Sequence, residues 1–290
     1  MNLLKDKIAL VTGGSRGLGR RTALLFAEEG ATVIFTDLQE NDSSRELLAE
    51  LQKMQPRSMF IASNAADYED TLRVADIVQK EFGRLDVLVN NAGYGYFGAL
   101  ETVPLEEGRK QMDVNLFGMV SLTRRVIPVM RSQGTGRIVN VSSVAGRMCF
   151  CFGGWYNISK YAVEAFSDVL RMETKPFGTQ VVIIEPGWAQ TEWGLIAAAH
   201  LRESSAGTIY EDMAEGEASL LAYAFGHLRF PSPMGVAKAV VKASLSRRPR
   251  LRYHPGGGGV ALLVLRKLLP ARVWDSLLLS ALRLMARKKK

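Results

Sequence analysis

The sequence predicts a doubly wound α/β fold, in which helices cover both faces of one parallel sheet. Over about the first 190 residues, short β-branched runs alternate with stretches whose apolar residues recur at helical spacing. The runs are almost continuously apolar, as strands covered on both faces should be. A glycine-rich loop follows the first run. The expected strands are 8–12, 32–37, 58–63, 86–90, 137–143 and 180–186.

The remaining segments complete the expected architecture. Helical spacing of Leu, Val, Ala and Phe is found at 19–29, 43–54, 69–82 and 113–132. Residues 188–234 mix aromatic residues with Gly and Ser, and we expect a helical lid there. A helix resumes at 235–246, and "PRLRYHP" is a candidate last strand. We therefore expect a single domain over 1–255 and a C-terminal helical extension over 256–290, which Pro270 divides into two short helices.

The composition indicates a globular protein of a reducing compartment. Of the 290 residues, 47% are hydrophobic, which is enough for a large core. Cys149 and Cys151 cannot form a disulfide framework and offer too few ligands for zinc, so no metal site is expected. The apolar run after Lys7 is too short for a secretory segment, and "VALLVL" at 260–265 is too short to span a membrane. These features predict a cytoplasmic protein.

The positive charge of the chain is concentrated in its tail. The net charge is +8, but residues 247–290 contain twelve Lys or Arg and one acidic residue, Asp275. The tail therefore carries +11, which leaves −3 for the rest of the chain. This distribution argues against nucleic-acid binding by the body of the protein.

The loop "LVTGGSRGLGR" at 10–20 predicts a nucleotide site. It follows the first strand and opens a helix, and its glycines let the backbone approach a pyrophosphate. The spacing is T-G-x-x-x-G-x-G, and an ordinary strand-to-helix turn is the alternative. Asp37 ends the second strand, where its carboxylate would bond ribose hydroxyls and repel a 2′-phosphate. Arg16 would instead attract that phosphate, so NAD is favoured and NADP remains the alternative.

Together with further motifs in the same order, this loop resembles the short-chain dehydrogenases/reductases. The resemblance covers about residues 5–252 and includes "NNAG" at 90–93, "DVNLFG" at 113–118, "VSSVAG", "YNISK" and "EPGWAQT" at 185–191. It implies a Rossmann-type dinucleotide-binding and catalytic domain. It also implies cofactor contacts from Gly13, Ser15, Arg16, Gly17, Leu18, Gly19, Asp37, Asn64, Ala65, Asn91, Ala92, Gly93, Tyr156, Lys160, Pro186, Gly187, Ala189 and Thr191. Asn64 stands where the family usually has Asp, which predicts an altered adenine contact.

The spacing of Tyr156 and Lys160 indicates proton transfer. A free tyrosine has a pKa of about 10, too high for a good base near neutral pH. A cation one helical turn away favours the phenolate, and the i, i+4 spacing places both side chains on one face. The resemblance implies that Lys160 also binds the nicotinamide ribose and that Ser143 bonds the substrate oxygen. It further implies that Asn115 anchors a water molecule linking Lys160 to solvent.

Aromatic residues between Ser143 and Tyr156 suggest an apolar substrate. We expect Phe150, Phe152 and Trp155 to line the pocket with Ser143 and Tyr156, although packing under the lid or at a subunit contact is the alternative. The expected reaction is alcohol–carbonyl interconversion on a steroid, retinoid or lipid-like substrate. A β-ketoacyl reductase and a non-catalytic nucleotide sensor are the alternatives. The resemblance also implies a homodimer or homotetramer.

The tail contains an apolar stripe at helical spacing. Its members are Val273, Trp274, Leu277, Leu278, Ala281, Leu284 and Met285, and the chain ends in "RKKK". Such a helix suits the surface of an anionic membrane, so peripheral contact through 260–290 is one hypothesis. Packing on the protein's own domain or on a partner subunit is the alternative.

Overall fold

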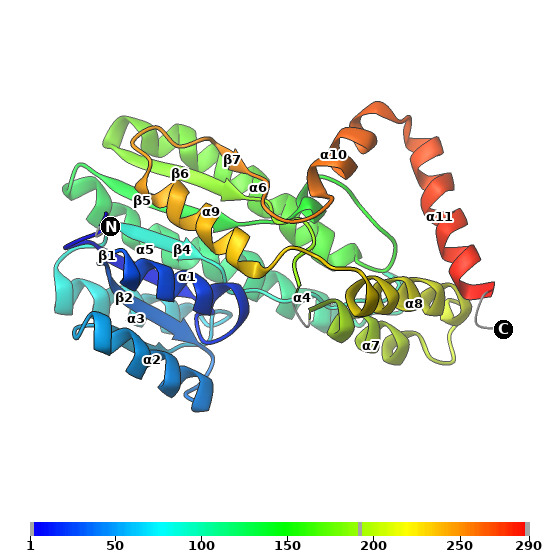
Figure 1. Cartoon of the computed structure of the whole chain (residues 1–290), viewed down its shortest axis with the longest axis horizontal. Helices are drawn as coiled ribbons and strands as arrows, with labels where there is room; N and C mark the ends of the chain where they lie inside the picture. Colours follow the sequence, from blue (N-terminus) through cyan, green and yellow to red (C-terminus); the bar gives the residue numbers. More distant parts are fainter. Residues whose placement is uncertain (1–2, 191–192, 288–290) are drawn as a thin grey trace.

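A computed structural model describes residues 3–190 and 193–287, and within these ranges one parallel sheet forms the centre of the protein (Figure 1). Its strand order is β3-β2-β1-β4-β5-β6-β7, and every neighbouring pair is parallel. The strands are β1 (Ile8–Thr12), β2 (Thr32–Asp37), β3 (Met59–Ala62), β4 (Val87–Asn90), β5 (Gly136–Val141), β6 (Thr179–Ile184) and β7 (Arg252–Tyr253). The predicted doubly wound fold is confirmed, and "PRLRYHP" contains the last strand.

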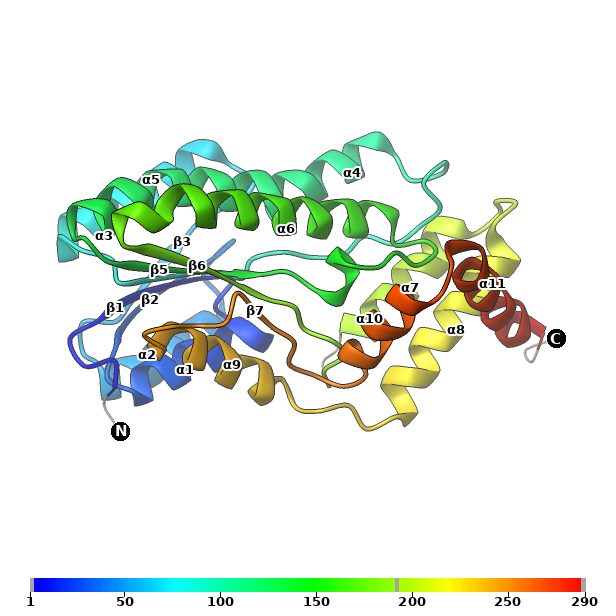
Figure 2. The same cartoon turned by 90° about the horizontal axis from the view of Figure 1, so that it is seen from above.

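Helices cover both faces of the sheet, because alternate residues of each apolar strand point to opposite sides. In β1, Val11 packs toward one core cluster and Leu10 toward the other. One face is covered by α1 (Gly17–Glu28), α2 (Asp42–Met54) and α9 (Pro233–Leu245). The other is covered by α3 (Tyr68–Phe82), α5 (Gly118–Ser132) and α6 (Gly154–Thr174), as Figure 2 shows.

The expected helix at 113–132 has two parts. A short helix, α4 (Leu105–Met112), precedes it and was not predicted, and residues Asp113–Phe117 then form a π-helical turn. Regular α-helix begins only at Gly118, whose backbone approaches Ala65 so closely that a methyl group would lie 1.7 Å from the Ala65 carbonyl oxygen. Wide turns of this kind often carry functional residues, and this one contains Asn115.

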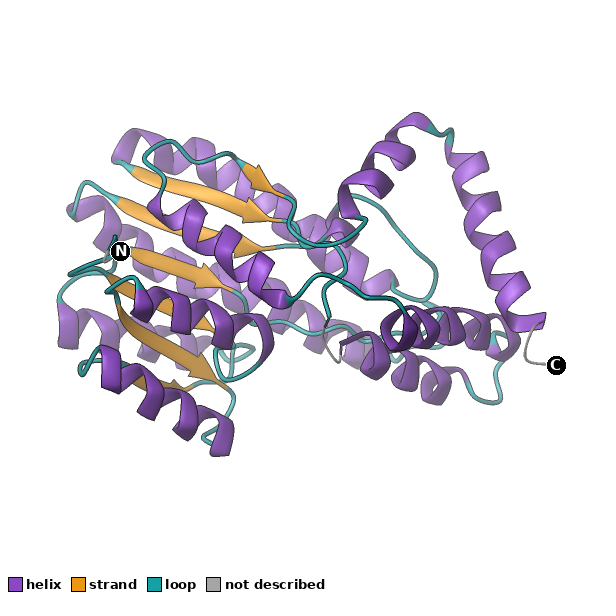
Figure 3. Ribbon diagram, in the orientation of Figure 1, coloured by secondary structure: helices purple, strands orange, loops and turns teal. Residues whose placement is uncertain are grey.

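Four further helices gather beyond the carboxyl ends of the strands (Figure 3). α7 (Trp193–Ser205) and α8 (Glu211–His227) occupy the segment expected to form a helical lid. α10 (Gly259–Leu268) and α11 (Ala271–Arg287) are separated at Pro270, as predicted. The strands direct their carboxyl ends toward these helices, so ligand-binding loops and helical cover meet at one end of the protein.

The apolar stripe of α11 is divided between two environments. Of the predicted stripe, Trp274 is buried against Val144 and Met148. Leu282, which was not part of that prediction, is buried beside α7 and α8. The expected alternative of packing on the protein's own domain therefore holds for this side of the helix. Val273, Leu277 and Leu284 lie on the other side and are exposed. No helix of the described residues is long and apolar enough to cross a membrane.

The glycine run that leads into α10 is held against the loop that follows β6. Trp188 and Gly257 exchange two backbone hydrogen bonds, of 2.9 and 3.2 Å. The Gly187 amide also donates to the Pro255 carbonyl at 2.8 Å. The beginning of the C-terminal extension is thus tied to the loop expected near the nicotinamide.

Candidate active site

The loop between β1 and α1 leaves its backbone accessible to a ligand. Gly13 has a left-handed backbone with φ of +63°, and a methyl group on Gly19 would lie 2.1 Å from the Gly13 carbonyl oxygen. Ser15 is fully buried, and its Oγ has no hydrogen-bond partner among the described residues. Because α1 begins at Gly17, its unpaired N–H groups lie at the same loop. This set of donors suits a pyrophosphate.

Asp37 lies directly beside the glycine loop. Its Oδ2 accepts the Ser15 amide at 3.0 Å, and its Oδ1 accepts the Leu38 amide at 2.9 Å. The carboxylate is therefore fixed at the carboxyl end of β2. Arg16 is exposed at the N-cap of α1 and makes no capping hydrogen bond within the described part of the chain. Leu18 is half-buried and packs on the core.

The "NNAG" segment holds the glycine loop in place. Asn91 Nδ2 donates to the carbonyl oxygens of Thr12 and Gly13 at 2.9 and 3.0 Å. The backbone amides of Asn91 and Ala92 both donate to Thr12 Oγ1 at 3.0 Å. Asn90 instead reaches Asn140 in β5 at 2.8 Å, so this segment also joins the central strands.

The expected adenine contacts lie at the end of β3. Asn64 is exposed, and its Oδ1 accepts the Ala66 amide at 3.0 Å. A narrow cavity opens beside it between α5 and the carboxyl ends of β1 to β4, and its lining includes Thr12, Ala65, Ala92 and Val114. Met119 and Leu122 of α5 also line this space, and its volume of about 20 Å³ is enough only for a water molecule. The adenine contact of Asn64 therefore stays a prediction.

Asn115 is buried, and its side-chain amide is engaged by the protein. Its Oδ1 accepts the Tyr94 amide at 3.0 Å, and its Nδ2 donates to the Tyr94 carbonyl and to Ser159 Oγ at 2.9 and 3.0 Å. A methyl group placed on Gly93 would lie 3.0 Å from Asn115 Oδ1 and 3.8 Å from Lys160 Nζ. Asn115, Gly93 and Lys160 are therefore brought together. The water-anchoring role of Asn115 stays a prediction.

Tyr156 and Lys160 lie in the first turns of α6 and face the end of β5. Lys160 Nζ donates to the Val141 carbonyl at 3.0 Å and lies 5.7 Å from the Tyr156 ring centroid. Burial lowers the pKa of Lys160 to about 8, and the negative charge of Glu164 opposes this effect. Burial raises the pKa of Tyr156, and a hydrogen bond with Ser143 opposes the increase.

Aromatic side chains surround Tyr156. Trp193 and Phe97 have ring centroids 5.6 and 6.1 Å from the Tyr156 ring, and Phe150 stacks on Phe97 at 6.0 Å. Phe150 thus lies in the region expected for a substrate. Phe97 and Trp193 were not predicted, because no motif spacing identifies them. Their only signal was aromatic residues following "NNAG" and the "EPGWAQT" turn.

Phe152 and Trp155 differ from Phe150 in their contacts. Phe152 is buried, with its ring centroid 6.4 Å from that of Tyr210, and has an unusual positive φ of 61°. Trp155 lies against Gly108 of α4, where a methyl group would be 2.3 Å from the indole. Adjacent helical residues point about 100° apart, so Trp155 faces α4 while Tyr156 faces the aromatic cluster. Phe152 belongs to the same apolar cluster as Phe97 and Tyr156, whereas Trp155 packs against α4. Their role in a substrate pocket stays a prediction.

The loop after β6 approaches the Ser143 turn. The Pro186 carbonyl accepts the Val144 amide at 3.1 Å, and Gly187 and Ala189 continue alongside. Thr191 lies outside the described residues. The residues expected near the nicotinamide therefore lie beside those expected near the reacting oxygen.

Comparison with known proteins identifies the family. The model of the family described as short chain dehydrogenase matches residues 7–196. This chain belongs to the short-chain dehydrogenase family. It is an NAD(P)-dependent oxidoreductase of the short-chain dehydrogenase/reductase type.

Several relatives match over most of this short-chain dehydrogenase. A short-chain dehydrogenase from Streptomyces avermitilis has a crystal structure that is similar with a TM-score of 0.76 and 32% identity, covering 90% of this chain and 92% of that one. A probable short-chain type dehydrogenase/reductase, VdlC, from Helicobacter pylori is 31% identical and covers 93% of this chain and 96% of its own length. A 3-ketodihydrosphingosine reductase from Bacteroides thetaiotaomicron is 37% identical over 63% of this chain and 64% of its own length.

The depressed pKa of Lys160 predicts a pH-dependent effect on stability. Because its pKa falls from 10.5 to about 8 on folding, the resulting stabilisation is present above about pH 10.5 and is lost as the pH falls through 8. Lys160→Met removes this dependence. The free energy of unfolding of the unchanged chain should therefore rise relative to Lys160→Met by about 2–3 kcal/mol between about pH 7 and about pH 10. Urea unfolding at both pH values measures it.

Lys53→Met, on the exposed surface of α2, is the matched control and should show no such trend. If the free energies of unfolding of the unchanged chain and of Lys160→Met differ by the same amount at both pH values, the lowered pKa of Lys160 is contradicted.

Proposed function

We propose that this short-chain dehydrogenase interconverts an alcohol and its carbonyl compound on an apolar substrate, with Tyr156 as the general acid and base. The observation that carries the proposal is the geometry around Tyr156. Its phenol bonds to Ser143, the Lys160 ammonium lies 5.7 Å from its ring, and the glycine loop lies at the same edge of the sheet. Asn115 completes the proposed catalytic set.

The proton-transfer step follows from these positions. When bound, a nicotinamide cofactor would supply the hydride donor or acceptor for the carbinol carbon, which leaves a proton to be moved at the substrate oxygen. Tyr156 takes this proton in the oxidation direction and returns it in the reduction direction. Burial disfavours the phenolate, so a nearby cation is required, and Lys160 supplies it. Ser143 Oγ holds the substrate oxygen within reach of the phenol.

The surroundings of Tyr156 support an apolar substrate. Phe97, Phe150 and Trp193 present aromatic surface beside the phenol. α7 and α8 supply further apolar side chains to the same cluster, so we propose that they act as a lid. Resemblance to a protein named for reduction of a ketone of dihydrosphingosine supports a lipid-like substrate.

We propose NAD as the preferred cofactor and NADP as the weaker one. The reason is Asp37, whose carboxylate is fixed by Ser15 and Leu38 at the end of β2. A 2′-phosphate bound there would meet a negative charge that is already held in place. Arg16 is near but exposed, and a solvated guanidinium offsets less of that repulsion.

Tyr156→Phe tests the acid–base assignment. We expect kcat for oxidation of a panel of steroids, retinoids and long-chain alcohols to fall about 10²–10⁴-fold, because the hydroxyl that moves the proton is lost. Cofactor affinity, measured by fluorescence titration, should change little. Tyr161→Phe alters an exposed tyrosine one turn further along α6 and serves as the control. Unchanged turnover in Tyr156→Phe would refute the assignment, and binding of cofactor without turnover in the unchanged chain would favour a sensor.

Asp37→Ala tests the cofactor preference. Removing the carboxylate removes its repulsion of the 2′-phosphate and its bonds to ribose, so kcat/KM for NADP should rise relative to NAD by about tenfold or more. The comparison needs both cofactors with one alcohol substrate. Asp42→Ala, at the exposed start of α2, is the control. An unchanged ratio in Asp37→Ala would contradict the role of this carboxylate.

We also propose that the protein works in the cytoplasm at a membrane surface and as a homodimer or homotetramer. The corner between α10 and α11 supports the membrane contact: Leu268 is 74% exposed, Leu277 is 52% exposed, and Lys267 and Arg272 flank them. Apolar side chains beside cations suit an anionic lipid surface.

A second exposed apolar stripe on α6, which includes Ile158, Val169 and Met172, supports contact with a second copy of the chain.

Vesicle flotation tests the membrane contact. The unchanged chain should float with vesicles containing phosphatidylserine and should dissociate as salt rises, because salt screens the basic residues. The double substitution Leu268→Ser and Leu277→Ser should reduce flotation by about tenfold or more. Leu3→Ser is the control, because Leu3 is exposed and close to the N-terminus, which lies far from α10 and α11 in Figure 1. Equal flotation of all three proteins, or a smaller oligomer of the double variant on size exclusion, would contradict membrane docking by this corner.

A further inference from the structure

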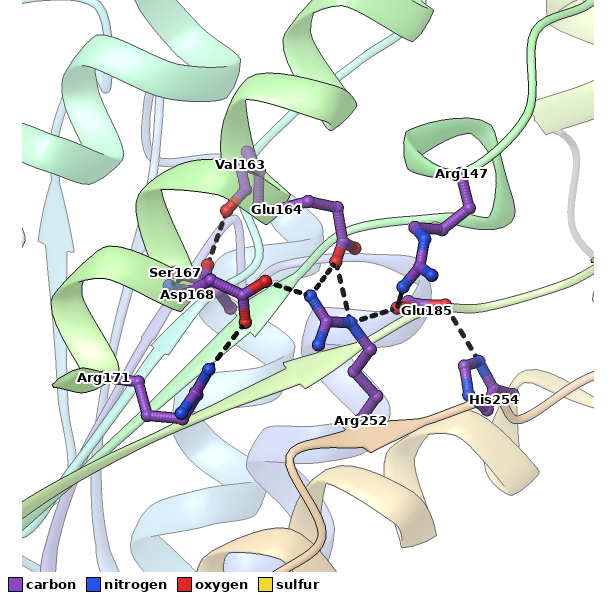
Figure 4. Close-up of polar contacts among 10 residues, drawn as sticks. Arg147, Val163, Glu164, Ser167, Asp168, Arg171, Glu185, Arg252 and His254 are labelled. Atoms are coloured by element: carbon purple, nitrogen blue, oxygen red, sulfur yellow. Dashed lines mark hydrogen bonds and ion pairs between the residues drawn. The ribbon is translucent and has the colours of Figure 1, made fainter.

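A buried cluster of charges lies one turn beyond Lys160 on α6 (Figure 4). Arg252 of β7 is at its centre. Its Nε lies 3.1 Å from Glu164 Oε2 and 2.9 Å from Glu185 Oε1, and its Nη2 lies 3.0 Å from Glu164 Oε2 and 2.6 Å from Asp168 Oδ2. Glu185 is fully buried and Glu164 is 6% exposed. One guanidinium therefore holds two buried carboxylates that come from different elements.

The cluster joins the segments that carry the proposed chemistry. Glu164 lies four residues after Lys160 on the same helix. Glu185 is the residue immediately before Pro186, at the start of the loop that follows β6. Arg252 lies in β7, just before the C-terminal extension. At the rim, Arg147 Nη1 lies 3.4 Å from Glu185 Oε1, His254 Nδ1 lies 2.9 Å from Glu185 Oε2, and Arg171 lies 3.1 Å from Asp168.

Arg252 offsets an unfavourable arrangement. Burial raises the pKa of Glu164, and the negative charge of Glu185 raises it further. Burial likewise raises the pKa of Glu185, while the charges of Arg147 and Arg252 lower it. Burial lowers the pKa of His254, so this imidazole adds little positive charge near neutral pH. An arginine stays charged at all accessible pH values, and Arg252 is the cation that contacts Glu164 and favours its ionised form.

Such a cluster costs more to bury than apolar packing of the same volume. A structural tether alone would not require two buried carboxylates. An ionised Glu164 affects Lys160. Among the described residues, the negative charge of Glu164 is the one identified influence that favours the protonated form of Lys160. Ser142 lies close to Glu164, because a methyl group on Gly146 would be 2.8 Å from Ser142 Oγ and 3.0 Å from Glu164 Cγ, and its neighbour Val141 accepts Lys160 Nζ.

We infer that Glu164, held ionised by Arg252, is a positioning residue that keeps Lys160 cationic beside Tyr156. The inference rests on the proposed function, because it assigns the cluster to the proton-transfer step. It also explains why the last strand is joined to α6: Arg252 enters the cluster from β7, so the C-terminal segment supplies a charge on which the site depends.

Glu164→Gln tests the inference with a nearly isosteric change. Loss of the negative charge should lower the pKa of Lys160 and thereby raise that of Tyr156. The acid limb of the kcat/KM profile for alcohol oxidation should move upward by about one pH unit, with about tenfold lower activity near neutral pH. Arg252→Met should move the limb in the same direction, because Glu164 then takes up a proton. Arg252→Lys and Glu164→Asp retain the charges, so their acid limbs should move by only part of this amount.

Arg171→Met is the matched control. Arg171 pairs with Asp168 at the rim of the same cluster but makes no contact with Glu164 among the described residues. Its profile should coincide with that of the unchanged chain. A purely structural role would lower the melting temperature of Glu164→Gln and reduce kcat equally at every pH. That result, or an unshifted profile in a folded Glu164→Gln, would overturn the inference, and Glu164→Asp provides the test if Glu164→Gln does not fold.

A second readout needs no turnover. The titration of the Lys160 ammonium is followed by ¹⁵N NMR as the difference between the chain and its Lys160→Met variant. Its midpoint should fall by about one pH unit when Glu164→Gln is introduced into both proteins. A shift in this titration together with unaffected oxidation by Tyr156→Phe would support the cluster and refute the proposed function. No shift together with lost oxidation by Tyr156→Phe would refute the cluster alone.

Discussion

Parallel strands all end at the same edge of their sheet, and the whole candidate site depends on this constraint. The glycine loop follows β1, Asp37 ends β2, "NNAG" follows β4, Ser143 follows β5 and Pro186 follows β6. These segments lie far apart in the sequence, yet the register of neighbouring strands brings them together. The bonds of Asn91 to Thr12 and Gly13 tighten this edge by joining two of the loops directly. One helix, α6, then adds Tyr156 and Lys160 over the same edge.

Burial of charged groups accounts for the electrostatics of the site. A tyrosine and a lysine enclosed by aromatic rings and backbone are both shifted toward their neutral forms. The proposed chemistry needs the opposite, a cationic lysine that favours the phenolate. The carboxylate of Glu164 acts in that direction, and it in turn depends on Arg252 from the last strand. The proposed site therefore extends beyond the four proposed catalytic residues.

The C-terminal extension has two surfaces with different surroundings. Trp274 and Leu282 join it to the body near the Ser143 turn and the α7–α8 helices. The opposite surface carries exposed leucines and valines beside cations. The extension can thus pack over the aromatic cluster around Tyr156 with one side and present its exposed side to the proposed membrane surface. The proposed membrane contact would give this basic tail a role separate from that of the slightly negative body.

Motif order and apolar periodicity were enough to predict the fold class, all seven strand positions and the residues that gather at the sheet edge, because local spacing and strand polarity are encoded along the chain. Helix α4, the π turn around Asn115 and the aromatic neighbours of Tyr156 were not predictable in this way. Phe97 and Trp193 reach Tyr156 from distant segments, and Trp155 turns toward Gly108 although it adjoins Tyr156 in sequence. No motif in the sequence distinguishes Arg252 from other arginines, and only the sheet places it between Glu164 and Glu185. Side-chain neighbours of this kind depend on packing between elements, and such packing has no periodicity in the sequence from which it could be read.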